Sequence, residues 1–113
     1  MKIFNTVDQS DLQKAGSMAK DVESNGYSGI TTFENRHDPF LPLAVCAANT
    51  NILELSTGVA IAFLRSPMST AQIAWDLTNL SKGRFILGLG SQIKAHNEKR
   101  FSCLLYTSPS PRD

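Results

Sequence analysis

The sequence is poor in several features that would place it in a specialised class of protein. It has 2 cysteines in 113 residues, and Cys46 and Cys103 stand at no spacing known from zinc or redox sites. Basic and acidic residues nearly balance, so the net charge of +1 gives no strong attraction to nucleic acid or to an anionic membrane. We therefore expect free thiols in a reducing compartment, Cys46 as a small core residue, and no nucleic-acid partner.

Long hydrophobic runs are also missing. No apolar stretch approaches the roughly 20 residues that a transmembrane helix needs, and the start MKIFNTVDQSDL is too short and too polar for a signal peptide. The expected location is therefore the cytoplasm, with no membrane partner. What remains is 42% hydrophobic and 19% charged, which is the composition of one ordinary globular domain.

Apolar and β-branched runs predict four strands. We expect them at residues 3–7, 28–33, 52–63 and from Phe85 onward, with the third broken or bulged near Gly58. Because helical segments separate these strands, the order βαβαβαβ predicts an α/β domain with a parallel sheet and right-handed crossovers.

Helical spacing and capping residues predict the three intervening helices. The expected helices run from a cap at Asp8 or Ser10 to Asn25-Gly26, over residues 41–49, and from Ser66-Pro67 to Ser81-Lys82-Gly83. On the third helix, Met68, Ala71, Trp75 and Thr78 mark one face, and Ile73, Leu77 and Leu80 widen the apolar stripe. Trp75 is expected to pack against the sheet. Lys82 and Arg84 are expected to form a solvated turn.

Polar or glycine-rich segments follow the predicted strands: ENRHD, LRS and SQIK. In parallel α/β folds, ligands bind at this carboxyl edge of the sheet. The strand FILGLG ends with Gly88 and Gly90, which either admit a ligand close to the backbone or only relieve crowding inside a barrel. The run GLGSQI lacks the third glycine of the dinucleotide fingerprint, which argues against a Rossmann domain.

Several segments together carry a resemblance to a known family. The run SPMSTAQIAWDLTNLSKGRFILGLGSQIKAHNEKRF, supported by NGYSGITTFE, HDPFLPLA and STGVAIAFLRSPM, resembles the luciferase-like monooxygenase superfamily. The nearest branch is the oxidoreductases that use coenzyme F420, a deazaflavin. The resemblance covers about residues 1–101 and implies the N-terminal half of a (β/α)8 TIM barrel, with four parallel strands and the helices outside.

The resemblance also implies the chemistry. It implies hydride transfer between F420, or FMN in other branches, and a small-molecule organic substrate, with the cofactor at the carboxyl ends of the strands. No metal is implied. The full-length form is expected to be a homo-oligomer.

Particular residues match the family's site. A bulge in the third strand, often with a non-proline cis peptide, backs the cofactor ring in many members, and Gly58-Val59 occupies that place. Gly90 and Ser91 match the region near the ribityl and phosphate part of the cofactor. The catalytic candidates, in the loop after the second strand where the family places polar residues, are Glu34, His37 and Asp38.

Two alternatives stay open beside these assignments. A lone histidine next to an aspartate, as at His37-Asp38, is often a loop hydrogen bond and no catalytic base. An acidic residue that some relatives carry after the fourth strand has no counterpart here, since Gln92, Ile93 and Lys94 occupy its place.

The predicted barrel stops halfway. A complete barrel needs eight strands and about 250 residues. We therefore expect a partial barrel domain at residues 1–101 and an unstructured tail at 102–113, SCLLYTSPSPRD. We interpret the tail as an artefact of the sequence, and the alternative is a natural disordered terminus. The resulting interpretation is an N-terminal fragment of an F420-dependent oxidoreductase, inactive by itself. The alternatives are a fragment of an FMN-dependent luciferase-like monooxygenase, or a non-catalytic half-barrel that acts only by self-association.

Overall fold

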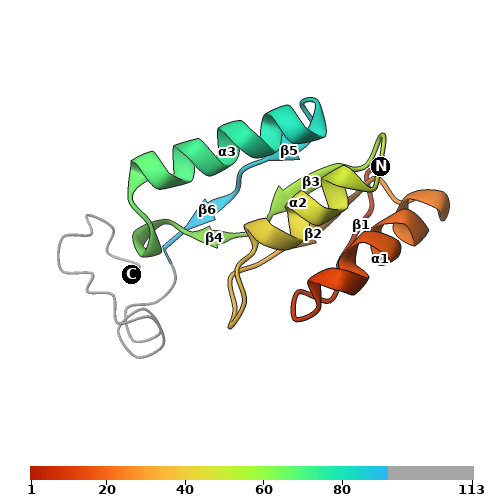
Figure 1. Ribbon diagram of the computed structural model, residues 1–113, viewed down its shortest axis with the longest axis horizontal. Helices are drawn as coiled ribbons and strands as arrows, with labels where there is room; N and C mark the ends of the chain where they lie inside the picture. Colours follow the sequence, from red (N-terminus) through yellow and green to blue (C-terminus); the bar gives the residue numbers. More distant parts are fainter. Residues whose placement is uncertain (92–113) are drawn as a thin grey trace.

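The computed structural model describes residues 1–91, and Figure 1 shows them as a layer of strands with helices packed along it. The elements, in chain order, are β1 (Phe4–Asn5), α1 (Leu12–Ser24), β2 (Gly29–Thr32), α2 (Phe40–Ala48), β3 (Glu54–Thr57), β4 (Ala60–Ile61), the 3-10 helix η1 (Ala62–Leu64), α3 (Pro67–Ser81), β5 (Phe85–Ile86) and β6 (Leu89–Gly90).

All strand pairs in this part of the chain are parallel. The main sheet has the order β1-β2-β3-β5, and a second, two-stranded sheet joins β4 to β6. The second sheet extends the first, because β4 follows β3 and β6 follows β5 along the same direction (Figure 1). The strand order therefore confirms the predicted parallel α/β architecture.

Two strands are interrupted where the sequence has glycine. A cis peptide bond at Gly58-Val59 separates β3 from β4, so the bulge expected at these residues is present, including the cis bond. Leu87 and Gly88 separate β5 from β6 in the same way. The hydroxyl of Thr57 donates to the carbonyl of Gly88 and accepts from its N–H, both at 2.8 Å, and so joins the two breaks.

Capping residues explain where the helices begin and end. The prediction that Asp8 or Ser10 caps α1 is wrong: the cap is Asp11, whose carboxylate accepts from the N–H groups of Gln13 and Lys14. Asp8 instead accepts from the N–H of Ser10 and holds the preceding turn. The predicted stop at Gly26 is confirmed by its positive φ of 86°.

The start and stop of α3 follow the prediction. The hydroxyl of Ser66 accepts from the N–H of Ser69 at 3.1 Å, and Pro67 is the first helical residue. At the other end, Lys82 and Gly83 both have positive φ, so the chain turns sharply into β5.

The core lies between the sheet and the first two helices. Its central residues are fully or nearly fully buried: Val7, Ala15, Ala19, Val22, Ile30, Leu43, Cys46, Ala47, Leu53 and Leu55. Cys46 is therefore the core residue that the sequence predicts, and burial raises the pKa of its thiol to about 11. None of the helices formed by residues 1–91 is both long and apolar enough to cross a bilayer.

Only part of the predicted apolar stripe of α3 packs inward. Trp75 is 71% exposed and Met68 is 68% exposed, so the expected packing of Trp75 against the sheet is wrong. The residues that α3 buries are Thr70, Leu77 and Ser81. The helix carries two apolar stripes, and the stripe with Leu77 and Ile73 packs onto Phe40, Ala44 and Phe85.

Arg84 is a structural residue, and the prediction of a solvated turn is wrong for it. Its guanidinium donates to five oxygen atoms between 2.7 and 3.1 Å away. The acceptors are the carbonyls of Ala47, Thr50, Leu53 and Ser81 and the hydroxyl of Thr50. Ala47 and Ser81 lie at the ends of α2 and α3, and Thr50 and Leu53 lie between α2 and β3, so Arg84 satisfies carbonyls at both helix ends and in this loop.

Candidate functional site

The predicted site residues gather where the parallel strands end. The N–H of Gly58 donates to the carbonyl of Thr32, the last residue of β2, at 2.6 Å. The N–H of Glu34 donates to the carbonyl of Val59 at 3.0 Å. Ile61 pairs with Gly90 between β4 and β6. The loop after β2, the bulge after β3 and the end of β6 are therefore neighbours at the carboxyl edge.

Val59 presents an apolar surface at this edge. Its side chain is 38% exposed, and Gly90 lies so close behind it that a Cβ on Gly90 would come within 2.6 Å of Val59 Cγ2. A Cβ on Gly58 would come within 2.7 Å of the hydroxyl of Thr31. The side chain of Val59 is thus supported from behind by backbone and remains partly open to solvent.

Gly88 and Gly90 face protein atoms in the part of the chain that the structure describes. A Cβ on Gly88 would collide with the carbonyl oxygen of Thr57, and one on Gly90 would crowd Val59. Of the two explanations that the sequence leaves open, the structure therefore supports relief of crowding between the interrupted strands. Ser91 follows Gly90 directly and is partly buried.

The carboxylate of Glu34 accepts three hydrogen bonds from two residues. Its side chain is only 5% exposed. One oxygen accepts from the N–H of Ile61 at 2.9 Å, and the two oxygens together form a bidentate pair with the guanidinium of Arg65 at 2.8 and 3.0 Å. This geometry is the strong, directional form of a carboxylate–arginine ion pair.

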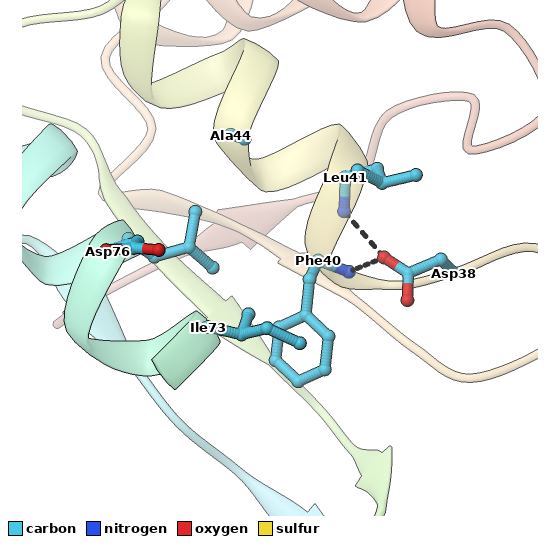
Figure 2. A pocket seen from close by; sticks show the side chains of 7 residues that line it. Asp38, Phe40, Leu41, Ala44, Ile73 and Asp76 are labelled. Atoms are coloured by element: carbon cyan, nitrogen blue, oxygen red, sulfur yellow. Dashed lines mark hydrogen bonds between the residues drawn. The ribbon is translucent and has the colours of Figure 1, made fainter. Parts of the chain in front are cut away.

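Asp38 joins the same cluster from the start of α2. One carboxylate oxygen accepts from the N–H groups of Phe40 and Leu41, both at 2.7 Å, as Figure 2 shows. The other oxygen accepts from Arg65 at 3.0 Å. Asp38 therefore secures the first turn of the helix and ties it to Arg65.

Arg65 is the residue of this cluster that the sequence interpretation missed. Its guanidinium bridges Glu34 and Asp38 and lies over the ring of Phe40, 4.9 Å from the centroid. The hydrogen bonds that Arg65 donates to the Glu34 carboxylate raise the pKa of Arg65 above its ordinary value despite partial burial. The signal was present in the segment LRS after the third strand, whose positive charge complements the acidic segment after the second.

His37 stays outside this cluster. Its main-chain N–H donates to the side chain of Asn35 at 2.7 Å, and its imidazole is exposed, with no hydrogen bond to another residue among 1–91. The pKa of Asp8 is lowered mainly by its hydrogen bond with the hydroxyl of Ser10, and the imidazole of His37 contributes slightly to this lowering. The structure therefore brings Glu34 and Asp38 together, whereas His37 is exposed and takes no part in their cluster within residues 1–91.

A separate hollow lies between α2 and α3. It has a volume of about 380 Å³, and Figure 2 shows Phe40 and Ile73 facing each other across it. Its lining is mostly apolar: Asp38, Phe40, Leu41, Ala44, Ile73, Asp76 and Leu77. Only Asp38 is shared with the cluster at the strand ends, and no predicted cofactor-binding residue lines it.

No metal centre is formed by the described side chains, because no three His, Cys, Asp or Glu residues among 1–91 gather closely enough. Gln92, Ile93 and Lys94 and the tail at 102–113 lie outside the described residues, as does the predicted domain boundary at residue 101.

The sequence matches a known family over most of its length. The profile of the family described as luciferase-like monooxygenase matches residues 3–110. Rv1360 of Mycobacterium tuberculosis is 53% identical over 93 residues, which are 82% of this chain and 27% of that protein. The 5,10-methylenetetrahydromethanopterin reductase of Methanolobus tindarius is 37% identical over 86 residues, 74% of this chain and 26% of the reductase. The chain thus spans about a quarter of the length of these relatives.

Solved structures share the fold. The coenzyme F420-dependent tetrahydromethanopterin reductase of Methanopyrus kandleri matches with a TM-score of 0.77 and 24% identity, over 88% of this chain and 29% of that one. The oxygenating component of 3,6-diketocamphane monooxygenase from Pseudomonas putida, solved with FMN, matches with a TM-score of 0.78 and 14% identity, over 100% and 35%. At these identities the likeness shows the fold, which is the first part of a luciferase-like TIM barrel.

Proposed function

Because the chain belongs to the luciferase-like monooxygenase family, we propose that it forms the cofactor-binding part of an F420-dependent oxidoreductase acting on a small organic substrate. The observation that carries the proposal is the partly exposed side chain of Val59, held at the carboxyl edge of the sheet by Gly90 behind it. Since the chain spans only part of its relatives, the proposal concerns a complete barrel that contains these residues.

The described residues fit a flat, largely apolar ring. Ligand sites combine an apolar surface with a few polar groups that fix orientation. Here Val59 supplies the apolar surface, and the polar loop after β2 lies beside it, because the N–H of Glu34 bonds the carbonyl of Val59. F420 supplies hydride transfer when it is bound, and the protein supplies position and electrostatics.

We assign the roles of the chain's own residues as follows. Gly58 and Val59 back the cofactor ring, and Gly90 and Ser91 border its ribityl and phosphate part. His37 is the polar side chain best able to approach a substrate, since its imidazole is exposed and makes no hydrogen bond to another described residue. These assignments extend the family resemblance with the positions that the structure gives.

FMN is the second candidate cofactor. The diketocamphane monooxygenase solved with FMN has the same fold as this chain, with a TM-score of 0.78. Two features favour F420: a solved structure of similar fold is named as F420-dependent, and its identity to this chain is higher, 24% against 14%. A direct comparison of the two cofactors is therefore part of the test.

The test uses a completed barrel, in which residues 1–91 are followed by the remainder of the 53% identical Rv1360. Titration with F420 and with FMN, followed by the absorbance and fluorescence of each cofactor, should show F420 binding. Val59→Asp should abolish that binding, because it places a charge against the ring. The matched control is Ile52→Asp, which changes a side chain that is 79% exposed in the loop before β3.

Three results would contradict the proposal. The cofactor assignment fails if the completed barrel binds FMN and not F420. The function as a whole fails if it binds neither. The placement of the ring on Val59 fails if Val59→Asp and Ile52→Asp bind F420 equally well.

A further inference from the structure

Glu34, in the loop after β2, holds the bulge that carries Val59. Glu34 donates its main-chain N–H to the carbonyl of Val59 at 3.0 Å, and its side chain accepts the N–H of Ile61 at 2.9 Å. β2 ends at Thr32, so β4 has no strand partner on that side in the described chain. Glu34 takes the place of that partner, with one main-chain and one side-chain bond two residues apart.

Arg65 fixes the side chain that makes this contact. The bidentate pair to Glu34 and the bond to Asp38 restrain the guanidinium, and its side chain is only 17% exposed. Phe40 packs under it at 4.9 Å. Arg65 thus donates three hydrogen bonds to the two carboxylates, and these bonds hold Glu34 in place.

The Glu34–Arg65 pair also affects the position of Gly90, the predicted cofactor-binding residue at the end of β6. β4 is the partner of β6, with Ala60 opposite Leu89 and Ile61 opposite Gly90. A shift of β4 would therefore move Val59 and Gly90 together. Side-chain clamps of this kind matter because small misplacements in a site change binding and rate strongly.

We propose that Glu34 and Arg65 form a positioning pair that holds the Val59 bulge and the end of β6 in the geometry needed for cofactor binding. This inference rests on the proposed function. It gives Glu34 a different role from that of the catalytic candidate that the family resemblance makes it. Glu34 acts through Val59 and Ile61, and Arg65 acts through Glu34.

The first arm of the test measures the clamp without any cofactor. Hydrogen exchange of the Ile61 and Glu34 amides is followed by NMR in the completed barrel, with no cofactor added. Glu34→Gln keeps the size of the side chain but removes its charge, and Arg65→Lys removes the bidentate pair. Both should speed exchange at Ile61 about tenfold. Asp76→Asn, which changes an exposed carboxylate of α3 that takes no part in the clamp, is the control and should change nothing.

The second arm measures F420 affinity of the completed barrel. Each variant should weaken binding about tenfold, and the double variant should be no worse than either single one, because both remove the same clamp. The absorption spectrum of bound F420 should shift in both variants, which a loss of stability alone does not cause. The pH–rate profile should keep its shape in Glu34→Gln.

The outcomes distinguish a positioning role of Glu34 from an acid–base role, and they distinguish failure of the clamp from failure of the proposed function. If Glu34→Gln removes one limb of the pH profile and leaves the affinity for F420 within twofold, Glu34 is an acid–base residue and the positioning role is wrong. Unchanged exchange at Ile61 in both variants would also overturn it. If exchange responds as expected but the unmodified barrel binds neither F420 nor FMN, the clamp exists and the proposed function is what fails, together with the clamp's link to a cofactor.

Discussion

The side chain of Val59 lies against the backbone of Gly90, and a Cβ atom added to Gly90 would come within 2.6 Å of Val59 Cγ2. The two residues come from β-strand segments 31 positions apart that the pairing of β4 with β6 brings together. Gly90 therefore makes room for Val59, and in the proposed cofactor site its effect on the ring depends on the position of Val59.

This contact predicts different costs for the two glycines of the interrupted strand. Gly90→Ala should destabilise the completed barrel by about 1 kcal/mol, because the end of the Val59 side chain can rotate away. Gly88→Ala should cost about 3 kcal/mol, because the obstacle is the main-chain carbonyl of Thr57. Urea denaturation gives both free energies of unfolding. Adding Val59→Ala should restore most of the loss in Gly90→Ala, and a lack of rescue would place the crowding elsewhere.

Glu23 should make stability depend on pH. Its carboxylate accepts three N–H groups of the loop before β3, those of Asn51, Ile52 and Leu53, between 2.7 and 3.0 Å. Burial tends to raise the pKa of Glu23, but these hydrogen bonds together lower it below the ordinary 4.5. A lowered pKa means that the stabilisation is complete above the ordinary value and is lost as the pH falls through the folded-state value.

We therefore expect Glu23→Gln to cost about 1 kcal/mol near neutral pH and nothing in acid below the folded-state pKa. Unfolding in urea at neutral pH and in acid measures the difference. Asp21→Asn, on the same helix, is the control, because the structure shows no bond to its side chain among residues 1–91. A constant cost of Glu23→Gln at all pH values would mean that the charge of Glu23 contributes nothing.

Replacement of Arg84 by lysine should destabilise the fold. Its planar guanidinium reaches five oxygen atoms, and an ammonium group has only three donors at one point. Arg84→Lys should lower the free energy of unfolding by about 2 kcal/mol, because buried carbonyls lose their partners. Thermal unfolding of the completed barrel measures this, with Arg36→Lys in the exposed loop after β2 as control. Equal melting of both variants would show that water replaces the guanidinium without cost.

The 113-residue chain alone should self-associate and show no F420-dependent turnover. Among the described strands, β1 and β5 each have a neighbour on one side only, and Ile86 is 47% exposed. Unpaired apolar edges of this kind promote association. Light scattering should show particles larger than a monomer, and Ile86→Lys should reduce them more than Asn79→Lys on the exposed side of α3. A monodisperse monomer that binds F420 at micromolar concentration would contradict this expectation.

Local features of the fold could be predicted from the sequence because a few adjacent residues determine them. Ser66-Pro67 starts a helix, Gly26 and Gly83 stop helices at positive φ, and Gly58 marks a strand break. The start of α1 was missed because several capping residues stand close together, and only the structure shows that Asp11 is the one used.

Contacts between distant segments could not be predicted. Arg65 and Glu34 are 31 positions apart, and Arg84 bonds carbonyls as far back as Ala47. Neither pairing leaves a periodic trace in the sequence. The site was therefore predicted by resemblance as a set of positions, and the structure adds which of them contact each other.

The exposed position of Trp75 has a practical consequence. It is the single tryptophan of the sequence, and it is 71% exposed on α3, on the opposite side from Leu77. Indole emission moves to shorter wavelength when water is excluded from the ring, so the intrinsic fluorescence of this chain reports from one known place. Any element that comes to cover α3, from the same chain or from another, will change that emission, and no attached dye is needed to observe the barrel close.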